Sequence, residues 1–222
     1  YTYNIIRELA MMDKKNTYHL LMYSELDLGF PLPANFIKKV YRTKSRILFD
    51  YLLLPFYSWR HRIGISLYPK NTFSPLVRGK KLPFFNDIVY FEKLGFREFK
   101  FFDNLHHTIM VPIAGRLSFL NLSISEFTAL RMKELLGIGS EKIRIIKLGI
   151  EKSFRHITSK KQLDEVIKKH GLKRPFYFYA GSLSPRKNML NVLRAFIKIK
   201  DRVPHGIYFT AGEDLDDSSA DV

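Results

Sequence analysis

Short strand-like segments alternate with helix-like segments along most of the sequence, and this alternation restricts the chain to one fold class. A buried strand is expected over 117–123, then a helix from Ser125 to Leu136, then a strand over 143–148. Ser125 suits the N-cap because its hydroxyl can accept from the free amides of the first turn, and Gly137 suits a left-handed stop. Strands alternating with helices of this length predict an α/β fold with a parallel sheet covered on both faces.

The same periodicity places the remaining elements. Helices are expected from the start of the chain through Ala10 and over 35–57, 92–104, 160–170 and 188–199, and strands over 18–23, 63–68, 82–91, 175–180 and 207–211. The polar, basic and weakly patterned segment 150–172 is typical of a domain junction. We therefore expect one domain over 1–150 and the beginning of a second over 151–222. A helix already under way at the first residue, and a stop after one strand, suggest that both ends are cut.

The chain is strongly basic, with 37 Lys and Arg against 21 Asp and Glu and a formal net charge of +16. This excess favours an anionic partner: nucleic acid, nucleotide phosphates or an anionic lipid surface. No helix-turn-helix, zinc-finger or aromatic RNP motif accompanies the cations, so nucleic acid is not expected. The lack of cysteine excludes disulfides, thiolate zinc sites and a cysteine nucleophile, and fits a cytoplasmic location. Neither a signal-peptide pattern nor an apolar run of roughly 20 residues is present.

The segment 176–196 carries the most informative chemistry. A strand ends at Gly181, where a missing side chain lets backbone and ligand approach closely. Arg186 and Lys187 stand just before a helix that Asn188 can cap, and the free amides and dipole of a helix N-terminus favour an anion. Together these features predict a phosphate site at the carboxyl end of a strand. The alternative is an ordinary strand-to-helix turn with solvated basic residues, and the residues alone leave the two evenly matched.

Three motifs resemble those of the group 1 (family 4) glycosyltransferases. They are Gly-Ser-Leu-Ser-Pro-Arg-Lys-Asn at 181–188 followed by Leu-Arg-Ala-Phe at 193–196, Asn-Leu-Ser-Ile-Ser-Glu-Phe at 121–127, and Glu-Lys-Ile-Arg-Ile-Ile-Lys-Leu-Gly-Ile-Glu-Lys-Ser-Phe at 141–154. Their order and spacing agree with the family, and together they cover about residues 117–212. The resemblance implies a GT-B fold with two Rossmann-like domains, the N-terminal one lacking its first strand and the C-terminal one truncated.

The family resemblance also implies an activity. It indicates transfer of a hexose from a nucleotide diphosphate sugar to a glycan or lipid-linked acceptor, with retention of configuration. Neither a metal nor a cofactor beyond the donor substrate is implied. The glycine-rich loop that precedes the opening helix in the family, and its late acidic motif, lie outside this sequence. The piece alone is therefore expected to be inactive.

Site residues follow from the same resemblance. In the loop, Lys187 would contact the donor diphosphate with Arg186 beside it, and Gly181, Ser182 and Asn188 would complete the donor site. On the other domain, the strand ending in Asn86 and Asp87 is similar to a family strand ending in His-Asp near the transferred sugar, which makes this pair the catalytic candidate. Ser125 and Glu126 are similar to a Ser-Glu pair on the acceptor side.

Two departures from the family pattern keep alternatives open. Asn86 replaces the histidine, and Ser182 stands where many members have an arginine. One alternative is a catalytically inactive glycosyltransferase homologue that acts as a scaffold. The other, from a different class, is a basic nucleic-acid-binding protein.

Several other patterns are interpreted as structural. Asp214 and Asp216 match the Asp-x-Asp of metal-dependent glycosyltransferases but stand in a polar tail and are expected to be solvated. The pair His106-His107 lacks a third ligand at useful spacing and is expected on a surface or loop. The Asn-Leu-Ser at 121–123 matches a glycosylation acceptor, yet a buried strand is predicted there.

The basic, aromatic stretch 38–62 has two interpretations. It is either a core-packing helix with a solvated basic face, which we favour, or a segment that lies on an anionic membrane surface with its apolar side down. The second interpretation would make the protein peripheral on the inner face of the membrane.

Overall fold

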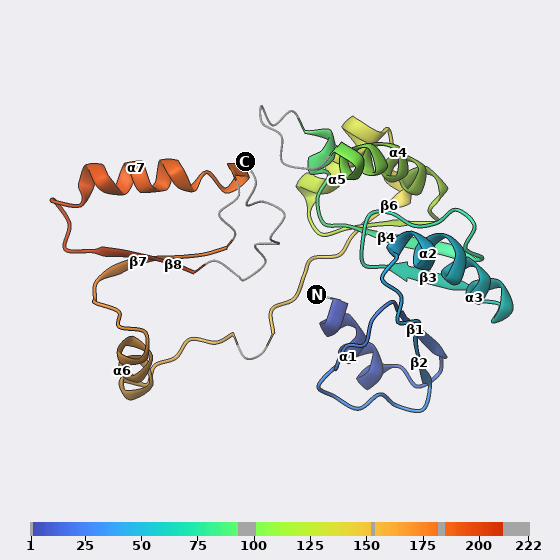
Figure 1. Ribbon diagram of the computed structural model, residues 1–222, viewed down its shortest axis with the longest axis horizontal. Helices are drawn as coiled ribbons and strands as arrows, with labels where there is room; N and C mark the ends of the chain where they lie inside the picture. Colours follow the sequence, from blue (N-terminus) through green and yellow to red (C-terminus); the bar gives the residue numbers. More distant parts are fainter. Residues whose placement is uncertain (1, 93–100, 152–153, 182–184, 211–222) are drawn as a thin grey trace. The chain divides into compact units, whose positions relative to one another are not determined.

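The computed structural model describes residues 2–92, 101–151, 154–181 and 185–210, and shows an α/β protein in which each described strand pair is parallel (Figure 1). The predicted parallel pairing is thus confirmed. The chain divides into two compact units, Tyr1–Glu92 with Phe101–Glu151 (unit 1) and Lys93–Lys100 with Lys152–Val222 (unit 2). The predicted two-domain GT-B arrangement stays a prediction.

Unit 1 holds two parallel sheets. Its elements are α1 (Thr2–Met12), β1 (Tyr18–Met22), β2 (Phe36–Val40), α2 (Arg46–Leu48), the π-helical turn η1 (Phe49–Leu53), α3 (Leu54–Arg60), β3 (Ile65–Tyr68), β4 (Lys80–Phe85), the 3-10 turn η2 (Val89–Phe91), α4 (Phe101–Leu117), β5 (Asn121–Ser123), α5 (Glu126–Leu136), the 3-10 turn η3 (Ser140–Lys142) and β6 (Ile143–Ile145). Strand β1 pairs with β2, while the second sheet has the order β3-β4-β5-β6.

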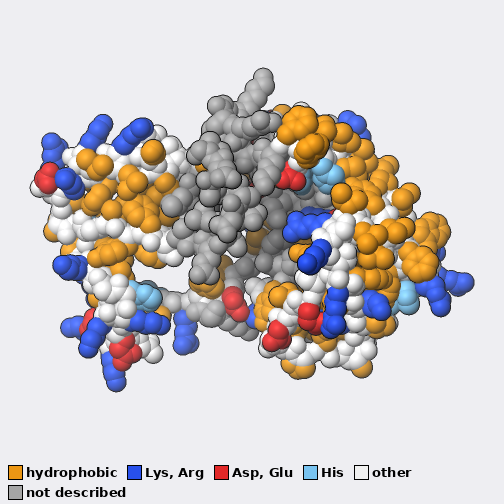
Figure 2. All heavy atoms as spheres, in the orientation of Figure 1, with side chains coloured by type: hydrophobic (Ala, Val, Ile, Leu, Met, Phe, Trp, Pro, Cys, Tyr) orange, Lys and Arg blue, Asp and Glu red, His pale blue; other side chains and the backbone are white. Residues whose placement is uncertain are grey.

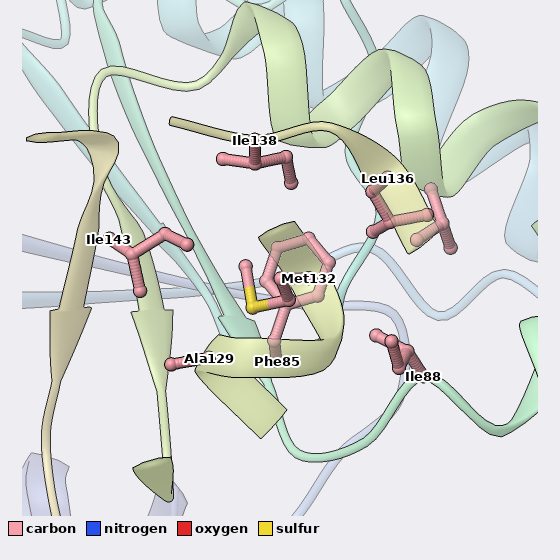
Figure 3. Close-up of a cluster of buried hydrophobic side chains, with 8 residues drawn as sticks. Phe85, Ile88, Ala129, Met132, Leu136, Ile138 and Ile143 are labelled. Carbon is pink, nitrogen blue, oxygen red and sulfur yellow. The ribbon is translucent and has the colours of Figure 1, made fainter. Parts of the chain in front are cut away.

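The main core of unit 1 forms where α4 and α5 pack against the second sheet. Phe85 of β4 and Met132 of α5 are fully buried at its centre, and Ile143 of β6 closes one side (Figure 3). A neighbouring cluster joins Tyr68, Phe73, Val77 and Ala114, with Leu54 of α3 packed against it. These two clusters fix the strand ends, and therefore the loops that carry the candidate site.

The expected helix after β5 is confirmed at both ends. Ser125 caps α5, since its Oγ accepts from the Thr128 amide at 3.1 Å. Gly137 ends the helix with φ 64°, and its amide donates to the Lys133 carbonyl. The rejected glycosylation site at Asn121 is fully buried in β5, as predicted.

The helix predicted over 35–57 is wrong in its first part, because residues Phe36–Val40 form β2. This strand pairs in parallel with β1, and Phe36 stacks on Tyr18 with ring centroids 4.6 Å apart. Pairing with a distant strand therefore overrides the helical spacing of the apolar residues. The helix begins instead after Ser45, whose hydroxyl accepts from the Leu48 amide at 3.2 Å.

Boundaries around α4 also differ from the prediction. Strand β4 ends at Phe85 rather than residue 91, and the helix expected over 92–104 is observed as Phe101–Leu117, with 93–100 outside the described residues. The strand predicted from residue 117 starts only at Asn121. Pro112 and Gly115 stand inside α4, and both residue types normally indicate the end of a helix in a sequence.

Unit 2 contains α6 (Lys160–Lys169), β7 (Phe176–Ala180), the 3-10 turn η4 (Pro185–Lys187), α7 (Met189–Ile199) and β8 (Gly206–Thr210). Strands β7 and β8 pair in parallel, so β7, α7 and β8 form a βαβ unit. Strand β7 has exposed side chains, and Phe178 is 60% exposed. Among the described residues of unit 2, β7 pairs with β8 alone. No second layer formed by these residues covers the outer side chains of β7.

Candidate functional site

The candidate catalytic and acceptor-side residues lie at the carboxyl-terminal edge of the β3-β4-β5-β6 sheet. Phe85 of β4 is in register with Ser123 of β5, which is in register with Ile145 of β6. Because parallel strands end at the same edge, the segments 86–87, 124–126 and 146–147 emerge side by side. The structure therefore brings together the two residue pairs that the sequence singled out separately.

Backbone contacts fix this juxtaposition. The Ile124 amide donates to the Phe85 carbonyl at 3.3 Å, and the Ile146 amide donates to the Ser123 carbonyl at 2.7 Å. The Thr128 hydroxyl, in the first turn of α5, donates to the Asn86 carbonyl at 3.4 Å. The start of α5 is thereby tied to the end of β4.

The charged groups at this edge face solvent. Asp87 is exposed, and its Oδ1 accepts from the Val89 amide at 3.4 Å. Lys147 Nζ lies 3.7 Å from Glu126 Oε1, with both side chains 78% exposed. An ion pair this exposed adds little stability. The Glu126 carboxylate and the Lys147 ammonium can therefore separate and bind a polar ligand at little cost in free energy.

At the N-terminus of α5, neighbouring side chains already meet a free backbone amide and the positive end of the helix dipole. Ser125 uses its Oγ to accept from the Thr128 amide, and Glu126 places a negative charge in the first turn, where the helix dipole favours it. We therefore do not expect a phosphate to bind at this helix end. Its hydroxyl and carboxylates suit the hydroxyl groups of a neutral ligand instead.

The two neighbouring histidines have different partners, as expected of adjacent positions on a helix. The His107 ring stacks on Tyr90 with centroids 4.0 Å apart, and its Nδ1 lies 2.8 Å from the Asp103 carbonyl oxygen. His106 Nε2 lies 3.1 Å from the Tyr51 hydroxyl oxygen, which is within hydrogen-bond distance. Burial is the main cause that lowers the pKa of His106 below its ordinary value, with the charge of His107 adding to it.

Sequence reasoning missed these aromatic partners. The predicted surface position is confirmed for His106, which is exposed, while His107 is half-buried, and both lie in helix α4 rather than in a loop. No sequence signal would have found Tyr51 and Tyr90, because they come from other elements. Within the described ranges, no three His, Asp or Glu side chains are grouped so that they could hold a metal ion.

The predicted phosphate loop of unit 2 begins at Gly181. This residue has φ 155°, a backbone conformation that L side chains rarely adopt, so a glycine is favoured here. The Gly181 amide donates to the Thr210 carbonyl at the end of β8, at 3.1 Å. The loop therefore leaves the sheet at the carboxyl ends of both strands.

Arg186 and Lys187 belong to the 3-10 turn η4, directly before α7, and both side chains are exposed. Helix α7 has no acidic residue in its first turn. Two cations thus precede a helix N-terminus whose dipole also favours an anion. This is the arrangement that the sequence predicted.

The predicted side-chain cap by Asn188 is wrong. Asn188 has left-handed backbone angles (φ 55°, ψ 35°) and its side chain makes no capping hydrogen bond. A side-chain cap normally requires extended backbone angles at this position, which direct the side chain toward the first-turn amides. The backbone carbonyl of Asn188, rather than its side chain, bonds to the start of the helix, because it accepts from the Asn191 amide at 3.1 Å.

Three predicted residues fall outside the described part of the chain. Ser182 of the phosphate loop and the Asp214 and Asp216 pair lie in the segments 182–184 and 211–222. Their predicted roles stay predictions.

The sequence matches no protein-family model and no curated protein. Among solved structures, the chain is similar to a glycosyltransferase from Rickettsia africae ESF-5, with a TM-score of 0.47, 12% identity, and coverage of 90% of this chain and 70% of that chain. Likeness of this degree does not assign the chain to a family, so the proposal below rests on the residues themselves.

No helix in the described part of the chain has both the length and the apolar character needed to cross a bilayer.

Proposed function

We propose that the protein is a glycosyltransferase that moves a hexose from a nucleotide diphosphate sugar to a glycan or lipid-linked acceptor. The observation that carries the proposal is the exposed pair Arg186 and Lys187 at the N-terminus of α7, at the carboxyl end of β7. A diphosphate bound there would meet two cations and the positive end of a helix dipole.

The chemistry of such a site fits glycosyl transfer. As the bond between sugar and diphosphate breaks, negative charge builds up on the departing diphosphate. Cations and oriented amides that are already in place stabilise that charge. Lys187 and Arg186 would supply this stabilisation, while Gly181 would allow the backbone to approach the donor closely.

Unit 1 would supply the acceptor side of the reaction. Its sheet edge presents Asn86, Asp87, Ser125 and Glu126, which are hydrogen-bonding groups of the kind that bind sugar hydroxyls. The proposal includes retention of configuration, independence of metal ions, no cofactor beyond the donor substrate and a cytoplasmic location. These details rest on the sequence resemblance.

A calorimetric titration with UDP, GDP and ADP tests the donor site. We expect one nucleotide to bind selectively, and Lys187→Ala to weaken that binding by about 1–3 kcal/mol, the scale of a charge-assisted hydrogen bond. Lys198→Ala is the matched control, because this exposed lysine lies in the last turn of the same helix. If all three nucleotides fail to bind, or if Lys187→Ala binds as well as the parent, the donor-site assignment is wrong.

Asn86 supports a second candidate, an inactive homologue. A side-chain amide neither accepts nor delivers a proton near neutral pH, unlike the histidine that the family pattern has there. A donor-hydrolysis assay on the parent protein and on Asn86→His separates the two. Hydrolysis that appears only in Asn86→His, with donor binding intact in both, would favour the inactive homologue.

A further inference from the structure

The helix formed by α2, η1 and α3 is apolar on its outer side as well as its inner side. Toward the core, Phe49 and Tyr57 are each 7% exposed. On the outer side, the exposed fractions of Leu52, Phe56 and Trp59 are 59%, 69% and 63%. A helix that is hydrophobic all round is normally buried. This helix lies on the surface of unit 1, so we expect its outer face to contact a binding partner.

An open groove of about 570 Å³ runs along this outer face. Leu52, Phe56 and Trp59 form one wall, and residues of the 75–79 segment form the other, including Leu76, which is 64% exposed. The Trp59 indole donates to the Leu76 carbonyl at 2.9 Å, which joins the two walls. Hydrophobic side chains gather over the α2–α3 side of unit 1 in Figure 2, with Lys and Arg at its border.

The polar border of the groove is cationic. Arg78 and Lys81 line the groove and also a second hollow of about 550 Å³, which adds Lys80. The Arg78 guanidinium lies 5.9 Å from the centre of the Trp59 ring. Between positions 38 and 81 the sequence has eleven Lys and Arg and a single acid, Asp50, which forms an ion pair with Lys70. The groove is therefore apolar inside, with Arg78 and Lys81 in its lining and Lys80 in the adjoining hollow.

We propose that this groove is a docking surface for anionic phospholipids of a bilayer. The outer side chains of the helix would enter the boundary between headgroups and acyl chains, and Arg78, Lys80 and Lys81 would contact lipid phosphates. The inference goes beyond glycosyl transfer and does not depend on it, because it uses none of the candidate donor or acceptor residues.

Two other occupants fit the observations less well. A second copy of the chain would bring the same positive surface against this one, and like charges repel. A nucleic acid would neutralise the cations but leave Leu52 and Phe56 in water, since it binds mainly through phosphates and stacked bases. An anionic bilayer can take up the apolar side chains of the groove and neutralise the neighbouring cations at the same place.

Trp59 provides a direct readout, because it is the only tryptophan in the chain. The protein is mixed with vesicles of phosphatidylcholine alone, and with vesicles of equal parts phosphatidylcholine and phosphatidylglycerol. We expect binding, a blue shift of Trp59 emission and quenching by brominated acyl chains with the anionic vesicles only. Inorganic phosphate alone should produce none of these changes.

Two double variants separate the groove from general surface apolarity. Leu52→Ser with Phe56→Ser removes two exposed groove residues and should weaken vesicle partitioning by at least about tenfold. Phe127→Ser with Leu130→Ser is the matched control, because these residues of α5 are exposed to similar extents, 69% and 51%, and lie outside the groove. The control should bind like the parent.

A second pair of variants tests the cations. Lys80→Gln with Lys81→Gln should lower binding to anionic vesicles, and Lys160→Gln with Lys161→Gln on α6 should not. The proposal is overturned if anionic vesicles do not bind, or if the two apolar double variants bind equally. It is also overturned if the Leu52 and Phe56 changes abolish oligonucleotide binding or self-association, measured by sedimentation, and leave vesicle binding intact.

Discussion

Replacing Gly79 by alanine is expected to cost unit 1 far more stability than replacing Gly137, although both glycines have positive φ. The angles are 86° for Gly79 and 64° for Gly137. An alanine in this region costs about 1–2 kcal/mol, of which the smaller entropy of the unfolded chain offsets about 0.4–1 kcal/mol. We therefore expect Gly137→Ala to lower the free energy of unfolding by about 1 kcal/mol, since its Cβ would meet nothing within 4 Å.

An alanine at position 79 would also clash with backbone atoms, whereas an alanine at position 137 would not. A Cβ at Gly79 would lie 2.5 Å from the Gly64 carbonyl oxygen and 2.6 Å from that of Ile63, and these backbone atoms cannot rotate away as a side chain can. The Lys80 amide donates to the same Gly64 carbonyl at 2.8 Å, so moving it would also strain the entry into β4. Overpacking of this kind costs about 1–3 kcal/mol more, which brings the expected loss for Gly79→Ala to about 3 kcal/mol.

Urea denaturation measures both variants. Trp59 emission follows unit 1, and circular dichroism is recorded in parallel because Gly79 borders the groove near Trp59. A difference of about 2 kcal/mol between the variants is expected, a factor of roughly 30 in the folding equilibrium. Equal losses, or a larger loss for Gly137→Ala, would refute the reasoning from backbone contact.

Three further predictions concern unit 1. Met132→Ala should lower the free energy of unfolding by about 2–5 kcal/mol, because the side chain is fully buried in the main core and truncation leaves a cavity; urea denaturation checks it. Ser125→Ala should cost about 1 kcal/mol in the same assay by removing the cap of α5, and an unchanged midpoint would argue against the cap. Burial, followed by the charge of His61, lowers the pKa of His19, so its contribution to stability is present above about pH 6.5 and is lost as the pH falls through the lowered folded value. Denaturation at a series of pH values should show this loss, and His19→Gln should flatten it.

The elements that could be predicted are those whose ends carry local chemical signals. Helix α5 begins at a serine and ends at a glycine, and both act on backbone groups a few residues away. The meeting of Asn86 with the start of α5 was not predicted, although it obeys one general property, that parallel strands end at the same edge. The position of the Arg186 and Lys187 pair before α7 likewise depends on sequence neighbours alone.

What could not be predicted depends on contacts between distant segments. Strand β2 forms because β1 is available to pair with it, and nothing within Phe36–Val40 reports the partner. Helix α4 continues through Pro112 because packing in the core outweighs a local preference. The stacking of His107 on Tyr90 arises in the same way, because the two rings come from different elements. For the proposed lipid-docking groove, the stretch 38–62 indicated a membrane surface as one of two interpretations, but the second wall comes from the 75–79 segment, which the sequence did not connect with it.

The π-helical turn η1 has a consequence for how this chain can evolve. The Leu54 amide donates to the Phe49 carbonyl five residues earlier, so the turn holds one residue more than an α-helical turn would. A turn of this width absorbs the extra residue locally, so the side chains after it keep nearly the orientation that a regular helix one residue shorter would give them. Tyr57 can therefore face the core, and Phe56 the groove, although the helix holds one residue more. Loss of one residue within this turn is thus expected to leave Tyr57 in the core, whereas loss of one residue from the regular part of α3 would rotate the side chains after it by roughly 100°.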